Sequence, residues 1–314
     1  MSFAALLETL NSVIWSPALV FVCLAVGIFF TISTLFMQIR CIPDMFQQMV
    51  GNDDSESGVS SFKALMISLA GRVGVGNIAG VATAIAYGGP GAVFWMWIVA
   101  IFGAATSFME CTLAQIYKEK DQDTGEYRGG PAYYIEKAFQ HTRARKFMLV
   151  YAIIFAVCMV LSGGYFLLGI QANGVADAMR NAWGINVWLS AAVSAVLVGV
   201  IIMGGVKRIA NFASLVVPFM AIIYILAAVI IMFVNFHHID DVFSLIFRSA
   251  FDREAMFSGM LGAAIMWGVK RGIYSNEAGQ GTGPQSAAAA EVSHPAKQGF
   301  VQAFAVYVDT LFVC

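Results

Sequence analysis

The sequence predicts an all-α protein that crosses a membrane several times, and three observations support this. Of its 314 residues, 59% are hydrophobic and 12% are charged. The mean hydropathy of +0.76 indicates more apolar surface than a soluble core can bury. The apolar residues also form long runs, several of which reach the roughly 20 residues that a helix needs to cross the hydrocarbon of a bilayer.

Apolar segments recur along the chain, and each is long enough to be a membrane helix or part of one. Polar connections separate the first six segments, charges interrupt the long seventh, and the eighth is still apolar at Cys314. We therefore expect helical segments at 17–37, 62–87, 91–117, 147–172, 186–205, 212–236, 256–290 and from 298 onward.

The distribution of Lys and Arg predicts which ends of the helices face the cytoplasm. Twelve basic residues lie in the connections after the first, third, fifth and seventh segments, whereas three lie in the opposite connections. By the positive-inside rule the first set is cytoplasmic, which places the N-terminus outside. Because this topology explains the basic clusters and the net charge is only −1, we exclude a nucleic-acid partner.

One cytoplasmic connection is long enough to hold an element of its own. It reads RGGPAYYIEKAFQ at 128–140, and Pro131 suits the first turn of a helix. We expect a short amphipathic helix that lies at the membrane interface.

The second segment predicts a helix that is broken inside the membrane. It reads SLAGRVGVGNIAGVATAIAYGG, with four glycines in ten residues beside Arg72 and Asn77. Each glycine costs about 1 kcal/mol relative to alanine in a helix interior. Irregular backbone at this depth is tolerated where protein or a water-filled cavity satisfies it. Close helix packing through Gly76 and Gly80 is the alternative, although it leaves Arg72 and Asn77 unexplained.

The seventh segment shows the same anomaly. It reads GMLGAAIMWGVKRGIYSNEAGQGTGP and surrounds a polar cluster with seven glycines. The cluster consists of Lys270, Arg271, Ser275, Asn276 and Glu277. We expect a helix broken in its middle, with a re-entrant hairpin as the alternative.

The two broken helices are five spans apart, and this spacing predicts an inverted repeat. Glycine-interrupted helices at corresponding positions of two halves point to the binding site of a transporter. An odd number of spans inserts the second copy upside down. This is the repeat of the leucine-transporter-type fold, whose second copy would comprise helices seven to eleven.

Free backbone groups at the two breaks suit a zwitterion and a small cation. The N–H groups of Val75, Gly76 and Asn77 are expected to face a carboxylate at the start of a half-helix. Carbonyls near Ala70 to Val73 and the Asn77 amide oxygen are hard ligands for a cation such as Na⁺. Carbonyls from Trp267 to Gly272 would receive an ammonium group.

Polar side chains in other helices have two open interpretations each. Gln171 and Asn173 follow the fourth apolar run, where Gln171 either contacts a zwitterion or lies at the aqueous end of its helix. The intramembrane cations need partners, which favours a gate or a structural ion pair over substrate contact. These cations are Arg72, Lys270 and Arg271, and the available carboxylates are Glu110 and Glu277.

No pattern in the sequence predicts an enzyme or a bound cofactor. The five cysteines show no C-x-x-C pair and no metal-ligand spacing. The four histidines are predicted in loops and do not form a catalytic set with a nucleophile.

Long motifs in the correct order resemble one family of membrane proteins. They are GGPGAVFWMWIVAIFG at 88–103, SNEAGQGTGPQSAAAAEVSHPAKQG at 275–299, and the shorter GRVGVGNIAGVATA and GIQAN. The chain is similar over nearly its whole length to the alanine or glycine:cation symporter family, the sodium:alanine symporters. The resemblance implies a multi-pass protein of the bacterial cytoplasmic membrane that carries alanine or glycine together with Na⁺.

The resemblance also implies an architecture and a set of site residues. One extra N-terminal helix and a linker would occupy 1–61, the first five-helix repeat 62–250, and the start of the second repeat 251–314. By position, Val75, Gly76 and Asn77 would hold the carboxylate, and Leu168 with Gln171 would line the pocket. Gly268 to Gly272 would receive the ammonium, and the Ala70 and Val73 carbonyls would contribute to a Na⁺ site. Relatives often have a hydroxyl residue where this chain has Val75, so polar contacts there would be made by backbone only.

The resemblance implies that the second repeat is unfinished. We therefore expect that the chain is a fragment that does not transport alone, a prediction that Na⁺-dependent alanine uptake by the isolated chain would refute. The alternatives are an amino-acid-binding channel, a membrane sensor, or a carrier coupled to H⁺ rather than Na⁺.

Overall fold

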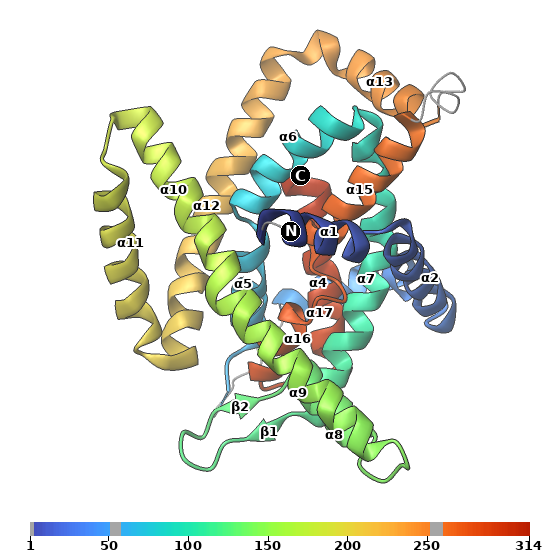
Figure 1. Cartoon of the computed structure of the whole chain (residues 1–314), viewed down its shortest axis with the longest axis vertical. Coiled ribbons are helices and arrows are strands. Elements are labelled where there is room, and N and C mark those ends of the chain that lie inside the picture. Colours follow the sequence, from blue (N-terminus) through green and yellow to red (C-terminus); the bar gives the residue numbers. More distant parts are fainter. Residues whose placement is uncertain (1–2, 51–57, 252–259) are drawn as a thin grey trace.

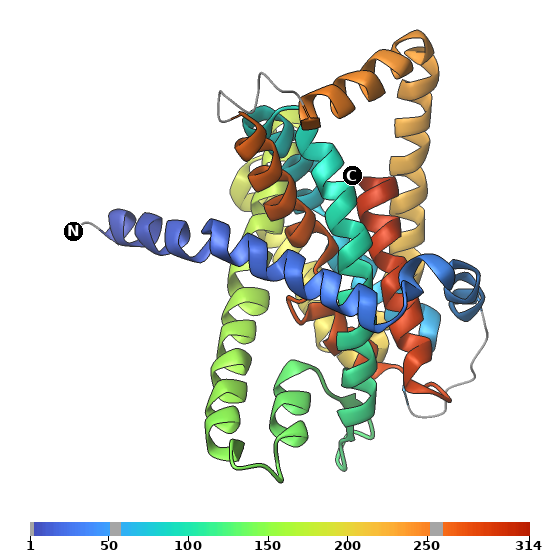
Figure 2. The ribbon, with the colours of Figure 1, turned by 90° about the vertical axis from the view of Figure 1, so that its right-hand side faces the viewer.

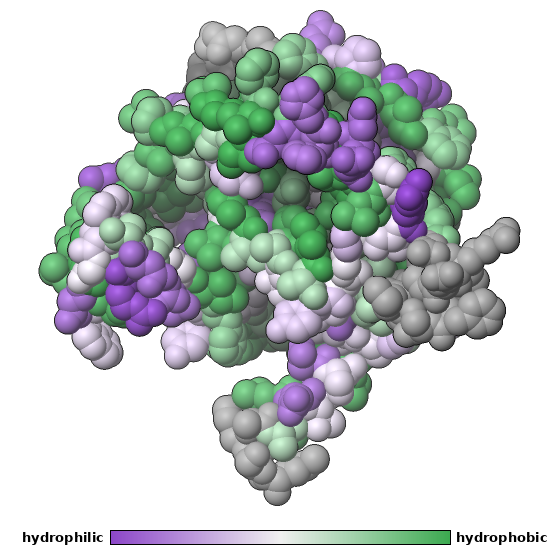
Figure 3. Space-filling view, turned by 90° about the horizontal axis from the view of Figure 1, so that it is seen from above, coloured by the Kyte–Doolittle hydropathy of each residue, from purple (hydrophilic) through white to green (hydrophobic). Residues whose placement is uncertain are grey.

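A computed structural model gives the structure of the chain and describes residues 3–50, 58–251 and 260–314. In these residues the chain is almost entirely helical, and the one sheet has two short strands. Many large hydrophobic residues are exposed, and they cover much of the face seen from above, between groups of polar residues (Figure 3). The prediction of an all-α polytopic membrane protein is therefore confirmed.

Within the described residues, four helices are long and apolar enough to cross a membrane, and a broken pair forms a fifth candidate span. The four are Ala5–Ser33, Gly91–Tyr117, Arg145–Trp183 and Gly205–Val234, and the pair is Ser61–Arg72 with Val75–Gly88. Val187–Ile202 is apolar but shorter. The predicted segments thus correspond to helices in order, although the predicted start of the seventh at Met256 lies outside the described residues.

The N-terminal helices form a rod that lies across the bundle. Helix α1 (Phe3–Ile14) leads into α2 (Pro17–Ser33), which packs on α7 (Gly91–Tyr117). Figure 2 shows this rod running across the more upright helices rather than along them. Two short helices, α3 (Met37–Arg40) and α4 (Ile42–Val50), complete the region before the linker.

The connection after α7 holds a hairpin and then the expected short helix. Strands β1 (Glu119–Lys120) and β2 (Tyr127–Arg128) pair antiparallel. Backbone N–H groups of Thr124 and Asp123 donate to Asp121, and these bonds hold the pKa of that carboxyl below its usual range. Helix α8 (Pro131–Ala138) begins with Pro131 in its first turn, because the missing N–H is not needed there.

The next helices, residues 145–234, lie beside the centre of the molecule, and their successive spans run in opposite directions (Figure 1). A π-helical turn, η1 (Ser162–Phe166), joins α9 (Arg145–Leu161) to α10 (Leu167–Trp183) in one continuous span. Because this turn does not end the helix, the span is longer than the sequence indicated. It is followed by α11 (Val187–Ile202) and α12 (Gly205–Val234).

One amphipathic helix was not predicted. A short 3₁₀ turn, η2 (Phe236–His238), leads into α13 (Ile239–Phe251), whose first turn contains Asp240 and Asp241. Phe243 and Phe247 of α13 lie against Trp97 of α7. The aromatic run at the start of α7 is thus in part a packing surface for α13.

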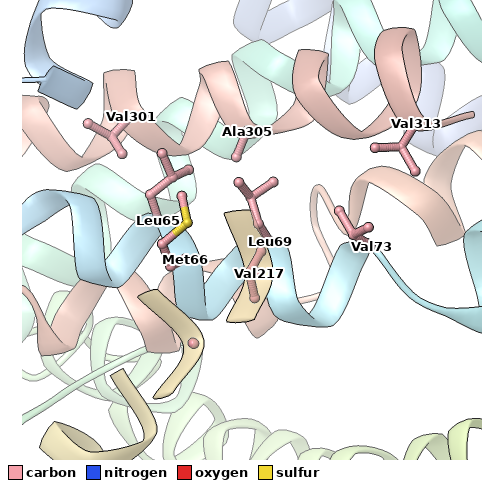
Figure 4. Packing of buried hydrophobic residues seen from close by; sticks show 9 residues of the cluster. Leu65, Met66, Leu69, Val73, Val217, Val301, Ala305 and Val313 are labelled. Atoms are coloured by element: carbon pink, nitrogen blue, oxygen red, sulfur yellow. The ribbon is translucent and has the colours of Figure 1, made fainter. Parts of the chain in front are cut away.

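The C-terminal helices pack in the middle of the fold. They are α15 (Met260–Asn276), α16 (Thr282–Ala289), α17 (Pro295–Tyr307) and the π-helical η3 (Val308–Val313). A buried hydrophobic cluster joins α17 and η3 to α5 (Ser61–Arg72) and α12 (Figure 4). Helix α6 (Val75–Gly88) packs on α15, so the two halves of the first broken helix contact the C-terminal helices along their length.

Candidate functional site

The first break lies at Val73 and Gly74, where α5 and α6 meet at 45°. Side chains of other helices approach the backbone closely at this point. A Cβ atom on Gly74 would lie 2.8 Å from Nε2 of Gln171, and one on Gly76 would lie 2.6 Å from Cε1 of Tyr274. A side chain at Gly76 would require the Tyr274 ring to move, whereas one at Gly74 would displace the flexible end of Gln171.

The first turn of α6 offers fewer free N–H groups than the sequence predicted. The N–H of Asn77 donates to the Gly74 carbonyl over 3.1 Å, inside the turn itself. The N–H of Val75 donates to Oε1 of Gln171, also over 3.1 Å. Among the described residues, the N–H of Gly76 has no partner. It is therefore the donor that is ready to receive an anionic group.

The second break lies at 277–281, several residues later than the carbonyls that we expected to be free. Trp267, Gly268 and Gly272 lie inside the continuous helix α15, where helical hydrogen bonds engage their carbonyls. A Cβ atom on Gly268 would lie 2.5 Å from the Ala92 carbonyl oxygen of α7, so this glycine allows close helix packing. The prediction that Trp267 to Gly272 offers free carbonyls is wrong, because these glycines serve packing rather than unwinding.

Left-handed backbone conformations produce this second break. Glu277 has a φ of 55°, and Gly279 and Gly281 have φ values of 82° and 91°. Glu277 is held in this strained conformation by a hydrogen bond of 2.6 Å from the Thr282 hydroxyl. The N–H of Gly279 donates to Oε1 of Glu110 over 3.0 Å, so Glu110 fixes the break from α7.

Arg72 joins the two breaks. Its side chain is fully buried, and its Nε atom lies 3.9 Å from Oε2 of Glu277. Its Nη1 atom donates to the Gln302 carbonyl of α17 over 3.4 Å. Of the three predicted intramembrane cations, Arg72 is thus the one that the structure brings to a carboxylate. Lys270 and Arg271 lie against aromatic rings instead.

A cavity of about 370 Å³ lies between the two broken helices and α10. Its wall contains Gly76, Asn77, Leu168 and Gln171, four of the residues predicted to bind substrate, and Ala70 from the predicted cation site. Val73 is not in the wall, because its side chain is buried in the hydrophobic cluster of α5, α12 and α17 (Figure 4). Hydroxyl, amide and carboxylate side chains near the breaks also line the cavity, and they belong to Ser68, Tyr274, Glu277, Gln280, Thr282 and Ser286.

Gln171 faces this cavity from the interior of α10, not from an aqueous helix end. Asn173 does not join it, because its amide donates to Asp177 over 3.4 Å on an exposed face. The side chain of Val75 packs instead against α10, where a Cβ atom on Gly174 would lie 2.6 Å from its methyl groups.

A buried polar cluster beside the cavity was not predicted from the sequence. Asp309 of η3 is fully buried, and its carboxylate accepts hydrogen bonds from the Asn77 amide and the Ser275 hydroxyl. The Thr310 hydroxyl donates to the same carboxylate over 3.0 Å. These oxygen atoms are hard ligands that suit a small cation. An aspartate within an apolar membrane segment was a signal that could have identified the cluster.

Comparison with known proteins decides the family. The family model described as the sodium:alanine symporter family matches residues 1–314, which is the whole chain. The chain belongs to the sodium:alanine symporter family. This family consists of transporters, so the predicted resemblance, the assignment as a non-enzyme and the placement as a multi-pass protein of the plasma membrane are confirmed.

Individual relatives are similar over most of this chain. YrbD of Bacillus subtilis (strain 168) is 55% identical over 99% of the chain, which corresponds to 62% of YrbD. The sodium/proton-dependent alanine carrier protein of Bacillus sp. (strain PS3) is 48% identical over 86% of the chain and 58% of that protein. The sodium/alanine symporter AgcS of Methanococcus maripaludis is 42% identical over 100% of the chain and 69% of AgcS. The chain therefore spans about three fifths of the length of the curated relatives that it matches.

Proposed function

We propose that this protein carries a small neutral amino acid, alanine or glycine, across the membrane by Na⁺-coupled symport. The observation that supports this most directly is that two broken helices meet around one cavity, with a free N–H at Gly76 in its wall. We propose further that these helices begin the two inverted repeats of a leucine-transporter-type fold, because they are five spans apart.

The substrate carboxylate would bind at the start of α6. The N–H of Gly76 is free for it, and the N–H of Val75 becomes free when Gln171 turns away. Two donors at a helix N-terminus form a favourable environment for an anion. Gln171 would then be able to contact the bound substrate from α10, while Leu168 would cover the side chain of the substrate.

The substrate ammonium would bind at the opposite break. The last turn of α15 leaves the Tyr274 carbonyl without a helical partner, because the Ala278 N–H donates to the Asn276 side chain instead. Tyr274 and Glu277 both lie in the wall of the cavity. This proposed ammonium site replaces the one that the sequence predicted at the carbonyls of Trp267 to Gly272. The two poles of the amino acid would thus contact the two breaks, which fits a zwitterion of small size.

The coupling ion would bind beside the substrate at Asn77, Ser275 and Asp309. These residues come from α6, α15 and η3, so a cation among them would draw three segments together. Asn77 also lies in the wall of the substrate cavity. Because Asn77 belongs to both sites, occupancy of one site would change the affinity of the other, and the effect would be reciprocal. Proton coupling is the second candidate, since Asp309 is a fully buried carboxyl group in the same cluster.

Uptake of labelled alanine into proteoliposomes by the full-length protein tests this function. With an inward Na⁺ gradient we expect uptake against the alanine gradient, and with choline or Li⁺ in place of Na⁺ we expect little. Equal uptake with all three cations would contradict Na⁺ symport. Flux that never exceeds equilibrium would favour a channel, and loss of uptake with a protonophore at constant Na⁺ would favour proton coupling.

A further inference from the structure

A second cavity, of about 320 Å³, lies between α1 and α15. Its wall is made by Asn11, Trp15, Trp267, Lys270, Arg271 and Tyr274. Tyr274 also belongs to the wall of the central cavity, so the two cavities share this residue. Lys270 and Arg271 precede Tyr274 on α15, which places the second cavity toward the end of the helix that we predict to be outside. We call it the outer cavity.

The outer cavity holds two cations beside aromatic rings. The Nζ atom of Lys270 lies 5.8 Å from the ring centroid of Trp15 and 5.9 Å from that of Trp267. The guanidinium carbon of Arg271 lies 5.8 Å from the centroid of Trp267 and 5.9 Å from that of Tyr274. Such contacts orient a cation over a ring face, but they do not neutralise its charge.

Neither cation has a carboxylate partner in the part of the chain that the structure describes. The ion pairs there join other residues, and Glu277, which follows on the same helix, pairs with Arg72. Two half-buried positive charges inside a membrane helix are unfavourable without a counter-charge. Within the described residues no ion pair neutralises these two charges, so the positive potential of the outer cavity would attract an anion of small size.

We propose that the outer cavity is a waiting site for the carboxylate of the incoming amino acid, bound by Lys270 and Arg271 before the substrate passes Tyr274. The guanidinium of Arg271 offers paired donors that match a carboxylate, and Lys270 adds a point charge. The aromatic rings of Trp15 and Trp267 lie beside Lys270, and such apolar surfaces lower the local dielectric constant and so strengthen the attraction. This proposal rests on the proposed function for the identity of the ligand, but its binding step needs no Na⁺.

Intrinsic tryptophan fluorescence of the purified full-length protein tests the site, because both rings that contact Lys270 are tryptophans. The protein is titrated in Na⁺-free buffer with alanine, with alaninamide, which lacks the carboxylate, and with choline chloride. We expect a saturable response to alanine and at least a tenfold weaker response to alaninamide. An equal response to alaninamide would overturn the proposal, and so would a full response to choline chloride, which would indicate a site for inorganic anions.

Variants separate this site from the central one. The double variant Lys270→Gln with Arg271→Gln should lose the response, and Lys270→Arg should keep it because the charge is kept. Asn77→Ala, which alters the central site, should also keep the fluorescence response to alanine. Binding at the outer cavity can therefore be measured even if Na⁺-driven uptake is absent. Arg248→Gln, an exposed cation on α13, is the matched control. An unchanged response in the double variant would overturn the proposal.

Transport kinetics give a second readout. If uptake is Na⁺-driven, the double variant should raise the alanine concentration for half-maximal uptake about tenfold and leave the maximal rate within twofold. Raising ionic strength with a choline salt should produce the same change in the wild type and little in the variant, since salt screens the attraction between the two cations of the outer cavity and the substrate carboxylate. A lower maximal rate with unchanged half-saturation would contradict a waiting site.

Discussion

The side-chain oxygen of Gln171 lies 3.1 Å from the backbone nitrogen of Val75 and caps the N-terminus of α6. A neutral amide thus occupies the place where we propose that the substrate carboxylate binds. Helix N-termini favour acceptors, and a charged acceptor binds there about twice as strongly as a neutral one. The amide is therefore a cap that a carboxylate can displace.

This relationship predicts an order of affinities. Gln171→Ala should weaken alanine binding about 2- to 10-fold, because one substrate contact worth about 1 kcal/mol is lost. Gln171→Glu should weaken it further, since a carboxylate at α6 competes with that of the substrate. Binding of labelled alanine measures both. Asn173→Ala, on the exposed face of the same helix, is the control and should bind normally. Tighter binding by Gln171→Glu would refute this interpretation of the cap.

The contact between Gly76 and Tyr274 predicts a steric effect. Gly76→Ala would place a methyl group 2.6 Å from the ring of Tyr274, so α6 or the ring must move. We expect at least a tenfold loss of alanine affinity. Adding Tyr274→Ala to Gly76→Ala removes the collision and should recover part of the loss. If Gly76→Ala alone binds like the wild type, the ring does not rest on the backbone in the binding conformation.

The pair of Arg72 and Glu277 predicts a large effect on stability. Arg72 is fully buried and Glu277 is 13% exposed, so Arg72→Met leaves a buried carboxylate without its cation. Removing one partner of a buried ion pair lowers the free energy of unfolding by about 3–5 kcal/mol. The exposed pair of Arg180 and Asp177 is the matched control, since Arg180→Met should change stability by about 1 kcal/mol or less. Thermal unfolding in detergent compares the two, and equal midpoints would contradict the structural role of Arg72.

The sequence predicted what depends on local pattern. Long apolar runs predicted the membrane helices, and glycines beside Arg72 and Asn77 predicted the first break. The position of the second break could not be predicted in the same way, because glycines in a membrane helix occur both at unwound positions and where helices pack closely. Gly268 and Gly272 are of the second kind. The break itself begins at Glu277, whose left-handed conformation depends on Thr282 and Arg72.

Contacts between distant segments explain the remaining differences. Asp309 was overlooked as a site residue, and its partner Asn77 lies more than 200 residues away in the chain. Helix α13 was missed because Asp240 and Asp241 interrupt the apolar run, while its aromatic residues find their partners on α7. The contact between Asp309 and Asn77 is tertiary, so no periodicity along the chain predicts it. Helix α13, in contrast, is amphipathic, and its apolar residues recur with helical spacing that could have predicted the helix but not its partner.

The cluster around Asp309 predicts a change in ion dependence. Asp309→Asn removes the negative charge that we propose as a ligand of Na⁺, and it should raise the Na⁺ concentration for half-maximal alanine binding at least tenfold. Ser275→Ala removes one hydroxyl and should have a smaller effect in the same direction. Asp241→Asn, an exposed carboxylate on α13, should leave the Na⁺ dependence unchanged. Normal Na⁺ dependence in Asp309→Asn would remove Asp309 from the cation site.

Lys118, at the C-terminal end of α7, predicts a dependence of stability on pH. Burial lowers the pKa of Lys118 to about 8, although the charge of Glu291 opposes this. Its ammonium group donates to the Ala290 carbonyl and lies 4.1 Å from the ring centroid of Tyr127. An unfolded lysine keeps its ordinary pKa of 10.5, so between about pH 8 and 10.5 the unfolded state binds more protons than the folded state.

A falling proton concentration disfavours the state that binds more protons, which here is the unfolded state. The free energy of unfolding should therefore rise with pH across this window. Thermal unfolding in detergent from pH 7.5 to 9.5 measures the effect below the range in which Tyr127 titrates, since burial raises the pKa of that phenol. Lys118→Met should lose this component of the pH dependence, whereas Lys146→Met, an exposed lysine in the first turn of α9, should keep it. If both variants follow the wild-type curve, Lys118 keeps its proton throughout the window and its burial does not set its pKa.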